Sequence, residues 1–347
     1  MKHLLWISFL AASASLLAVD TSYSPPLGGM TVTVQAGTAS SVGLPLIHAS
    51  VGTGAMIGRI DSVGPSYIDV HTADWTPGGL SAAATPYYLR IRSGASSGRV
   101  FMVTTDGSNT ASRVFVDNDG TDLTTLGITT GASGDAYELV LADTLISLFG
   151  SSTFIGGSSV TSADIVQTWN GAAWQTYYYN TTNSRWQRSG SGAGFNNFVL
   201  RPDRGFMITR RIASGDLTLR VTGRVPETAP RYFHSRAGFT FLSNGLPVDM
   251  TYANFALQTR ALDWQAGTSP SAALSNADLM QIWNGATWIN AYYDSGLSRW
   301  RRANVGGANL DNFTISAGQP IMIRRLNTDA NANNGLITMP LPYSISL

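Results

Sequence analysis

One block of residues occurs twice in this chain, and the duplication constrains the fold more than any other feature. The first copy begins at Asp164 and reads Asp-Ile-Val-Gln-Thr-Trp-Asn-Gly-Ala-Ala-Trp. The second begins at Asp278 and reads Asp-Leu-Met-Gln-Ile-Trp-Asn-Gly-Ala-Thr-Trp. Matching residues lie 114 positions apart, as Trp169 and Trp283 do. A spacing kept over so many residues indicates two copies of one domain.

The repetition continues beyond this block. Its further pairs are Tyr178-Tyr179 with Tyr292-Tyr293, Arg185-Trp186 with Arg299-Trp300, and Arg210-Arg211 with Arg324-Arg325. Between these pairs the spacing slips by one residue, where Asn197-Phe198 matches Asn312-Phe313. The repeated residues are mostly aromatic residues, glycine and asparagine, which more often build a fold than perform chemistry.

Short runs of alternating polarity predict strands throughout the chain. Examples are Thr31–Val34, Tyr88–Ile91 and Leu217–Val221, with turn signals such as Asn170-Gly171 between runs. We therefore predict an all-β protein with two homologous β-sandwich or barrel-like lobes in tandem. The strand after Asn170-Gly171 carries aromatic residues on both faces. One face should form the core, and the other should pack against an insert, a neighbouring copy or another molecule.

The two copies differ by an insertion. Gly43–Leu46 matches Gly245–Val248, but roughly a hundred residues follow in the first copy and about ten in the second before the match resumes. We predict a signal peptide at 1–18, a first lobe formed by 19–49 and 141–228, and a second lobe at 229–347. The residues between, 50–140, should form a small β-barrel module inserted in the first lobe.

Composition narrows the location and the partners. Charged residues make up only 12% of the 347 residues and the net charge is +1, which argues against nucleic acid as a partner. A positive start at Lys2, an apolar run at 4–10 and small residues at 12–14 predict a secretory signal. No later stretch is long enough to span a bilayer. Without cysteine there are no disulfides. We expect a bacterial protein that is secreted, extracellular or on the outer cell surface.

Several of these motifs together resemble an uncharacterised family of secreted, internally duplicated β-rich proteins common in verrucomicrobial bacteria. The motifs that carry the resemblance are Gly43–Leu46, Ser93–Arg99, Ala163–Gly171, Tyr178-Tyr179 and Trp186, with the second copy at Ala277–Gly285, Tyr292-Tyr293 and Trp300-Arg301. The resemblance implies export and a duplicated β architecture. It implies no catalytic residues, and the C-terminal sorting tail usual in that family is not evident.

No catalytic motif stands out, so we predict that the protein is not an enzyme. The histidines after the signal, His48, His71 and His234, lack metal-ligand spacing. Asp164 and Asp278 recur at equivalent strand starts, where bonds to backbone amides are expected; a glycosidase with a cryptic carboxylate pair is the weaker alternative.

No cofactor is predicted, with one candidate for calcium. Asp117, Asp119 and Asp122 place carboxylate oxygens before and after a glycine, as calcium-binding loops do. The later glutamate of an EF-hand is missing. The competing interpretation of this segment is an Asp-rich hairpin turn.

The repeated aromatic residues are the main candidates for a ligand site or an interface. They are Trp169, Trp174, Tyr178, Trp186, Trp283, Trp288, Tyr292 and Trp300. Core or interface positions are favoured, because both copies keep them; stacking on sugar rings is the alternative.

We therefore expect a self-assembling structural subunit of an extracellular fibre or surface layer, a homo-oligomer or polymer. The alternative is a carbohydrate-binding or adhesion protein that uses exposed Trp and Tyr faces and has glycans as partners. An extended N-terminal segment should act as an assembly arm on a neighbour's sheet. Its candidate residues are Tyr23, Pro25, Pro26, Met30, Val32 and Val34.

Overall fold

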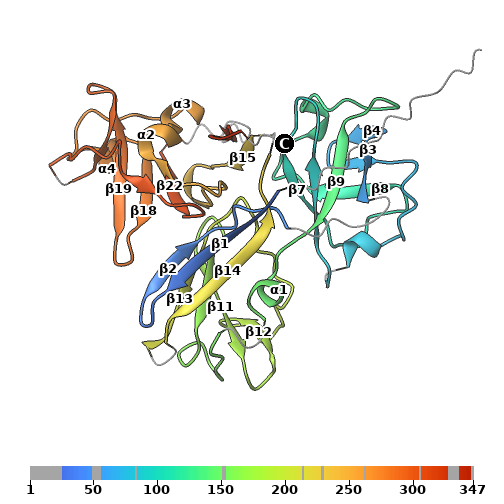
Figure 1. Cartoon of the computed structure of the whole chain (residues 1–347), viewed down its shortest axis with the longest axis horizontal. Coiled ribbons are helices and arrows are strands. Elements are labelled where there is room, and N and C mark those ends of the chain that lie inside the picture. The colour runs from blue at the N-terminus through green and yellow to red at the C-terminus, as the bar shows by residue number, and fades with distance from the viewer. Residues whose placement is uncertain are drawn as a thin grey trace, which may run out of the picture.

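A computed structural model describes residues 26–48, 56–82, 84–150, 154–212, 215–227, 230–261, 263–304, 306–326 and 336–344. Nearly all regular elements in these ranges are strands, and the helices are short, so the prediction of an all-β protein is confirmed. The strands form three bodies, a first lobe, an inserted barrel and a second lobe (Figure 1). No helix of the described residues is long and apolar enough to cross a membrane.

The first lobe is a five-stranded antiparallel sheet beside a two-stranded ribbon. The sheet has the order β12-β11-β10-β13-β2. Its strands are β2 (Ala39–Val42), β10 (Ile165–Trp169), β11 (Trp174–Asn180), β12 (Arg185–Arg188) and β13 (Phe206–Thr209). The ribbon pairs β1 (Leu27–Val34) with β14 (Leu217–Arg224). A short helix, α1 (Leu145–Phe149), begins at a capping box formed by Thr144 and Ser147.

The second lobe repeats this arrangement strand for strand. Its sheet has the order β20-β19-β18-β22-β16. The strands are β16 (Gly238–Leu242), β18 (Leu279–Trp283), β19 (Trp288–Asp294), β20 (Arg299–Arg302) and β22 (Ile321–Arg325). The matching ribbon pairs β15 (Arg231–His234) with β23 (Leu336–Met339). The additional elements are β17 (Met250–Thr251), α2 (Tyr252–Phe255), α3 (Leu257–Arg260), α4 (Ala273–Asn276) and β21 (Thr314–Ile315).

The inserted barrel is a seven-stranded sheet that closes on itself. Its order is β3-β9-β6-β7-β8-β5-β4. The elements are β3 (Ile57–Arg59), β4 (Ser62–Gly64), β5 (Tyr67–Asp69), η2 (Gly79–Ser81), β6 (Tyr87–Ile91), β7 (Val100–Val103), β8 (Arg113–Asp117), η3 (Leu123–Thr125) and β9 (Ala136–Leu141). The two end strands of the sheet, β3 and β4, follow each other directly in the chain. Between them, the Ile60 amide donates to the Asp135 carbonyl next to β9, and the Asp61 amide donates to the Asp69 carbonyl of β5, so this segment is bonded to both neighbours. Closure leaves the sheet without a long free edge.

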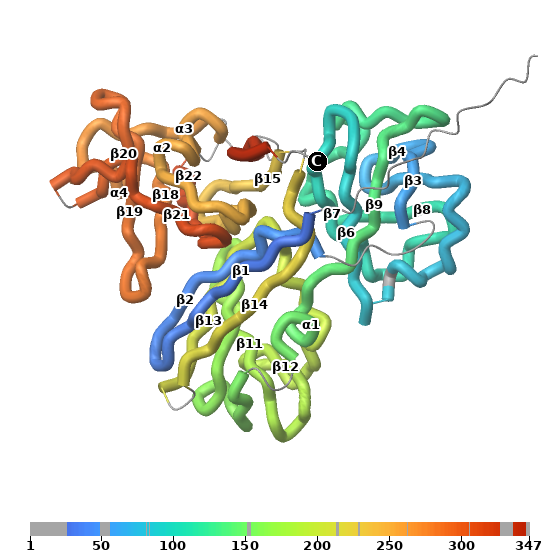
Figure 2. Tube along the Cα trace, viewed as in Figure 1, coloured from blue at the N-terminus to red at the C-terminus, as the bar shows by residue number. Residues whose placement is uncertain are grey.

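The structure places the insertion within the first lobe more narrowly than the sequence did. Thr144 bridges to Val199 before α1, and Thr251 pairs with Thr314 before α2, so these threonines are equivalent. Asp143 therefore corresponds to Met250, and the chain between Leu46 and Asp143 replaces a single residue of the second lobe. The tube in Figure 2 follows the chain out of the first lobe, through the barrel and back.

The strand register corrects one detail of the repeat. Ile165 lies opposite Thr209 in the first lobe, and its counterpart Leu279 lies opposite Arg324 in the second. Arg210 is therefore equivalent to Arg325, not to Arg324 as the uniform spacing suggested. The one-residue slip near Asn197 persists to the end of the sheet, because the inserted residue lies in a loop and each strand keeps its own register.

Candidate functional site

Two of the repeated tryptophans belong to the cores of the lobes. Trp186 and Trp300 are almost completely buried, each within the largest hydrophobic cluster of its lobe. Phe149 and Phe154 surround Trp186, and the Trp186 indole N–H donates to the carbonyl of Gly150 at 3.0 Å. These two rings hold the lobes together internally and do not present a ligand platform.

The other four tryptophans meet between the two lobes. Trp169, Trp174, Trp283 and Trp288 pack with residues of both sheets in a separate hydrophobic cluster, called here the lobe–lobe interface. Its other members are Ala39, Met207, Phe241 and Met322. Phe241 lies at its centre: its ring centroid is 5.3 Å from that of Trp174 and 5.9 Å from that of Trp288. The second aromatic face of the sheet thus packs against the neighbouring copy, one of the arrangements expected from the sequence.

The hydrogen bonds across this interface are reciprocal. The Trp169 indole donates to the Phe239 carbonyl at 2.9 Å, and the Trp283 indole donates to the Ala39 carbonyl at 2.8 Å. Ala39 and Phe239 are equivalent, because they lie opposite Thr209 and Arg324. Equivalent residues also meet each other: Met207 and Met322 share the cluster, and a Cβ added at Gly205 would collide with Pro320. The lobes therefore pair as the two halves of an isologous dimer do, in a contact that closes on itself.

Tyr178 and Tyr292 occupy equivalent buried networks of different charge. In the first lobe, Asn180 donates to Gln187 at 2.8 Å beside the Tyr178 hydroxyl. In the second lobe, the corresponding residues are Asp294 and Arg301, which form an ion pair at 2.7 Å beside the Tyr292 hydroxyl. A neutral pair in one copy thus replaces a charged pair in the other, and both satisfy their buried polar groups.

The recurring aspartates serve the fold. Asp164 accepts hydrogen bonds from the backbone amides of Ile155 and Arg211 at 2.8 Å each, and it pairs with the Arg210 guanidinium. Asp278 accepts from the amides of Gln265 and Leu326 and pairs with Arg325 at 2.9 Å. The expected bonds to backbone amides are confirmed, and both carboxylates are inaccessible to solvent.

The calcium candidate is not assembled as a ligand set. Asp117 accepts from the Asp119 amide, and Asp122 caps η3 through the amide of Thr124 at 2.9 Å. The Asp119 carboxylate instead pairs with Arg201 of the first lobe at 2.8 Å. Among the described residues, no three His, Cys, Asp or Glu side chains gather as metal ligands. Local turn bonds and two arginines, Arg201 and Arg236, account for the three carboxylates.

The proposed assembly arm is corrected in part. Met30, Val32 and Val34 lie in β1 and pair with β14 of the same lobe, and Val34 is fully buried. Apolar residues at every second position bury this face against the first-lobe core, so the strand belongs to its own chain. The Pro26 carbonyl accepts from Val225. Tyr23 and Pro25, like the signal peptide at 1–18, lie outside the described residues.

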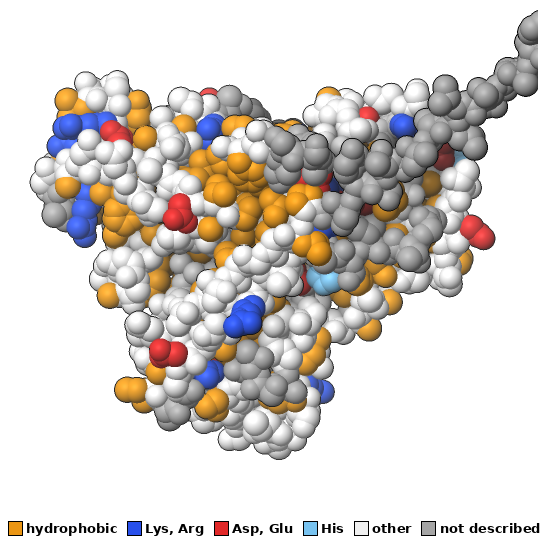
Figure 3. Space-filling model, in the orientation of Figure 1, with side chains coloured by type: hydrophobic (Ala, Val, Ile, Leu, Met, Phe, Trp, Pro, Cys, Tyr) orange, Lys and Arg blue, Asp and Glu red, His pale blue; other side chains and the backbone are white. Residues whose placement is uncertain are grey.

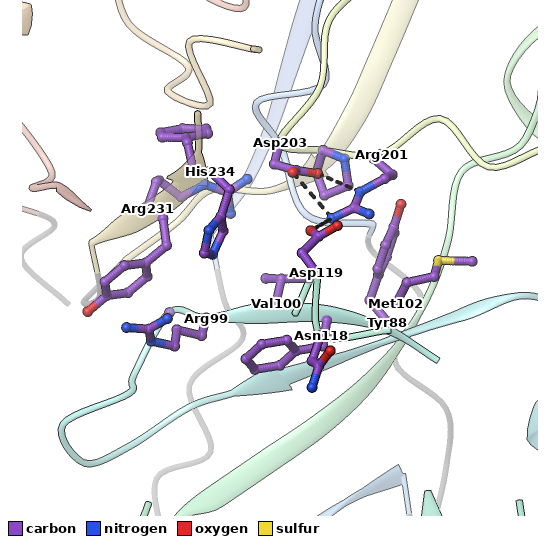
Figure 4. A pocket seen from close by; sticks show the side chains of 15 residues that line it. Tyr88, Arg99, Val100, Met102, Asn118, Asp119, Arg201, Asp203, Arg231 and His234 are labelled. Carbon is purple, nitrogen blue, oxygen red and sulfur yellow. Dashed lines mark hydrogen bonds and ion pairs between the residues drawn. The ribbon is translucent and has the colours of Figure 1, made fainter. Parts of the chain in front are cut away.

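A cleft lies where the three bodies meet, and sequence reasoning did not find it. This junction cleft is a narrow space, open on one side, between β7 of the barrel, the loop before β13 and β15 of the second lobe (Figure 4). Its polar lining residues are Tyr88, Arg99, Asn118, Asp119, Arg201, Asp203, Arg231, Tyr232 and His234. They come from segments far apart in the chain, so no sequence motif joins them.

One side of the junction cleft is a paired network. Arg201 donates to Asp203 at 3.0 Å and to Asp119 at 2.8 Å, and Arg204 also pairs with Asp203. Burial would raise the pKa of Asp203, but the charges of Arg201 and Arg204 outweigh it and hold that pKa at about 2. The Arg201–Asp119 pair joins the first lobe to the barrel, and the pairs with Asp203 hold the first-lobe loop in place.

The other side of the cleft is cationic and unpaired. Arg231 is only 6% exposed and has no hydrogen-bond or ion-pair partner among the described residues. Burial and repulsion by Arg90 lower the pKa of Arg231 to about 10, so it remains charged at neutral pH. Arg99 stacks 4.8 Å above the Tyr232 ring, and burial lowers its pKa as well. Burial also lowers the pKa of His234, which favours its neutral form.

A second depression lies in the first lobe alone, called here the first-lobe groove. It is an open depression that combines an aromatic floor of Tyr177, Phe198 and Phe206 with polar groups of Thr168, Asn170, Gln175 and Arg188. In the second lobe, Ile282 and Ile289 replace Thr168 and Gln175 and are buried in the core. The groove therefore distinguishes the two copies.

Comparison with known proteins found no match: no protein-family model, no curated protein and no solved structure is similar to this chain. The resemblance to the secreted verrucomicrobial family stays a prediction that rests on the quoted motifs.

Proposed function

We propose that the protein is a secreted structural subunit, without enzymatic activity, that assembles with copies of itself on the outside of a bacterial cell. The observation that carries this proposal is the edge of β1. This strand is eight residues long and pairs with β14, and no other strand of the described residues pairs along its second edge. A strand edge of this kind offers unpaired backbone groups to another strand.

The sequence of β1 supports the same proposal. Proteins that must stay monomeric protect such edges with charged residues or proline, and Leu27–Val34 contains neither. Leu27 is 70% exposed at the start of the strand. Thr31 and Thr33 line an open polar groove that is bounded by Ala39–Ser41 of β2 and by second-lobe loops at Trp283–Gly285 and Ser316–Gln319.

The isologous lobe–lobe interface defines the unit that would assemble. Because this contact closes on itself, it cannot propagate a fibre, and growth needs a second, different contact. Figure 3 shows hydrophobic side chains gathered near the middle of one face, where the second lobe meets the rest of the molecule, while the periphery is mostly uncharged. A sparsely charged surface offers little repulsion between copies.

Charging the β1 edge is expected to abolish assembly. Thr31→Lys with Thr33→Lys puts two positive charges on exposed positions of the edge strand and leaves its buried face unchanged. The control is Thr218→Lys with Thr222→Lys, on exposed positions of β14 one strand away. Negative-stain electron microscopy and sedimentation velocity of the mature protein should show ordered oligomers or fibres for wild type and control, and monomers for the edge variant. Monomers in the wild type would refute the proposal.

Glycan binding is the second candidate function, and the first-lobe groove favours it. Aromatic rings beside amide and guanidinium groups match the stacking and hydrogen-bonding needs of a sugar ring. Of the interface tryptophans only Trp169 also lines this groove, whereas Trp174, Trp283 and Trp288 pack between the lobes.

The second lobe supplies a design for closing the groove. Thr168→Ile with Gln175→Ile copies the residues of the filled lobe, so the variant should fold while losing any glycan bound by the wild type. Glycan-array binding checks this, with exposed Asn183→Ala as the control. Undiminished binding by the double variant would exclude the groove.

A further inference from the structure

We propose that the junction cleft is a binding site for an oxyanion: a phosphate, sulfate or carboxylate group carried by a small ligand. The ligand would contact Arg231 of the second lobe and Arg99 of the inserted barrel. This proposal goes beyond the assembly proposed above and does not depend on it.

Arg231 is a buried cation that faces the junction cleft. A guanidinium that is charged and buried carries a large desolvation cost unless an anion or acceptor compensates it. Arg231 has no such partner among the described residues, yet it lines the junction cleft, whose space is open to a ligand. Its fork of N–H donors suits the oxygens of a carboxylate or phosphate.

Arginines outnumber carboxylates around the cleft. Three carboxylates at the junction already serve six arginines. Glu138 pairs with Arg90, Arg92 and Arg224, while Asp119 and Asp203 together pair with Arg201, Arg204 and Arg236. Arg231 and Arg99 are additional to these. The junction therefore has a marked excess of positive charge, whereas the whole chain has a net charge of only +1.

The hydroxyl of Tyr88 is a second unpaired hydrogen-bond donor in the lining of the junction cleft. Tyr88 is 7% exposed, and its hydroxyl has no hydrogen-bond partner. Tyr88 lines the junction cleft and, with Arg231, also an adjoining pocket at the root of the barrel. In Figure 4, Arg231 and Arg99 approach the cleft from opposite sides, above and below the space next to His234. The space between them is narrow, so it suits the anionic group itself, with the rest of the ligand extending outward through the open side of the cleft.

Titration calorimetry on the full chain tests this site with sodium phosphate, sodium sulfate and sodium acetate, each against sodium chloride at equal ionic strength. We expect saturable one-site binding of at least one oxyanion, and the strongest one identifies the tetrahedral or the carboxylate class. Arg231→Gln should lower that affinity about tenfold to 100-fold, the usual effect of a lost charged hydrogen bond. Arg220→Gln, on an exposed position of β14, is the matched control and should bind as the wild type does.

Stability separates binding from a structural role. Because Arg231→Gln removes an unpaired buried cation, the variant without ligand should melt no lower than the wild type, but phosphate or sulfate should no longer raise its melting temperature. If Arg231→Gln does not fold, Arg99→Gln tests the same site from the barrel side. No saturable binding beyond chloride, or undiminished binding by a folded Arg231 or Arg99 variant, overturns the proposal.

Discussion

Replacing Phe241 with alanine is expected to lower the free energy of unfolding by about 3–5 kcal/mol, the range for a large buried aromatic side chain. Phe241 is 1% exposed and contacts both Trp174 and Trp288. Its counterpart in the first lobe is a serine, Ser41, so one phenylalanine fills the centre for both copies. Chemical denaturation followed by tryptophan fluorescence measures the change, since the affected rings are tryptophans.

Phe239→Ala is the matched control, two residues earlier in the same strand. Its ring is 40% exposed at the rim of the interface, so the loss should be about 1 kcal/mol or less. Equal losses of unfolding free energy for Phe241→Ala and Phe239→Ala would contradict a central role of Phe241 in the interface.

Glu138→Gln should be similarly costly, because it removes the carboxylate that Arg90, Arg92 and Arg224 share at the root of the barrel. The Glu138 side chain is inaccessible, and Arg224 binds it through two hydrogen bonds of 3.1 Å. Breaking one side of a buried ion pair costs about 3–5 kcal/mol. Glu227→Gln, at a half-buried position with no ion pair to another residue that the structure describes, should change stability little. Thermal unfolding of both variants distinguishes these outcomes, and an unchanged melting temperature for Glu138→Gln would contradict a supporting role.

The same residue predicts a loss of stability in acid. Burial raises the pKa of Glu138, but hydrogen bonds and charge from Arg224 and Arg90 outweigh it and leave the pKa below its ordinary value. A depressed carboxylate pKa stabilises the fold fully above the unfolded pKa of about 4.3 and loses this contribution as the pH falls through the folded pKa. The stability difference between wild type and Glu138→Gln should therefore shrink below about pH 4.

The duplication and the all-β class could be predicted because they depend on local patterns: alternating strands, turn dipeptides and a kept spacing. The aromatic positions were also visible, and their double-faced strand indicated a packing partner. The sequence did not identify this partner as the other lobe, because contacts such as Trp169–Phe239 join residues of different copies. The one-residue slip that makes Arg210 and Arg325 equivalent, paired with Asp164 and Asp278, could not be predicted either. An extra residue in a loop leaves no local pattern in the sequence.

The junction cleft lay beyond sequence reasoning for a different reason. Arg99, Arg201 and Arg231 are separated by roughly a hundred and by thirty residues, and only the folding of three bodies against one another brings them together. An arginine in a strand such as β15 is ordinarily solvated, so nothing in the sequence marks Arg231 as buried. The groove in the first lobe was detectable in principle, as Thr168 and Gln175 opposite isoleucines in the second copy.

We expect the aromatic interface to hold the two lobes as one rigid unit. Because the chain has no cysteine, Thr218→Cys and Leu297→Cys introduce unique spin-label sites, one exposed on each lobe. Double electron–electron resonance should give one narrow distance distribution that broadens when Phe241→Ala is added and stays narrow with Phe239→Ala. A broad distribution in the parent, or a narrow one unaffected by Phe241→Ala, would contradict the claim.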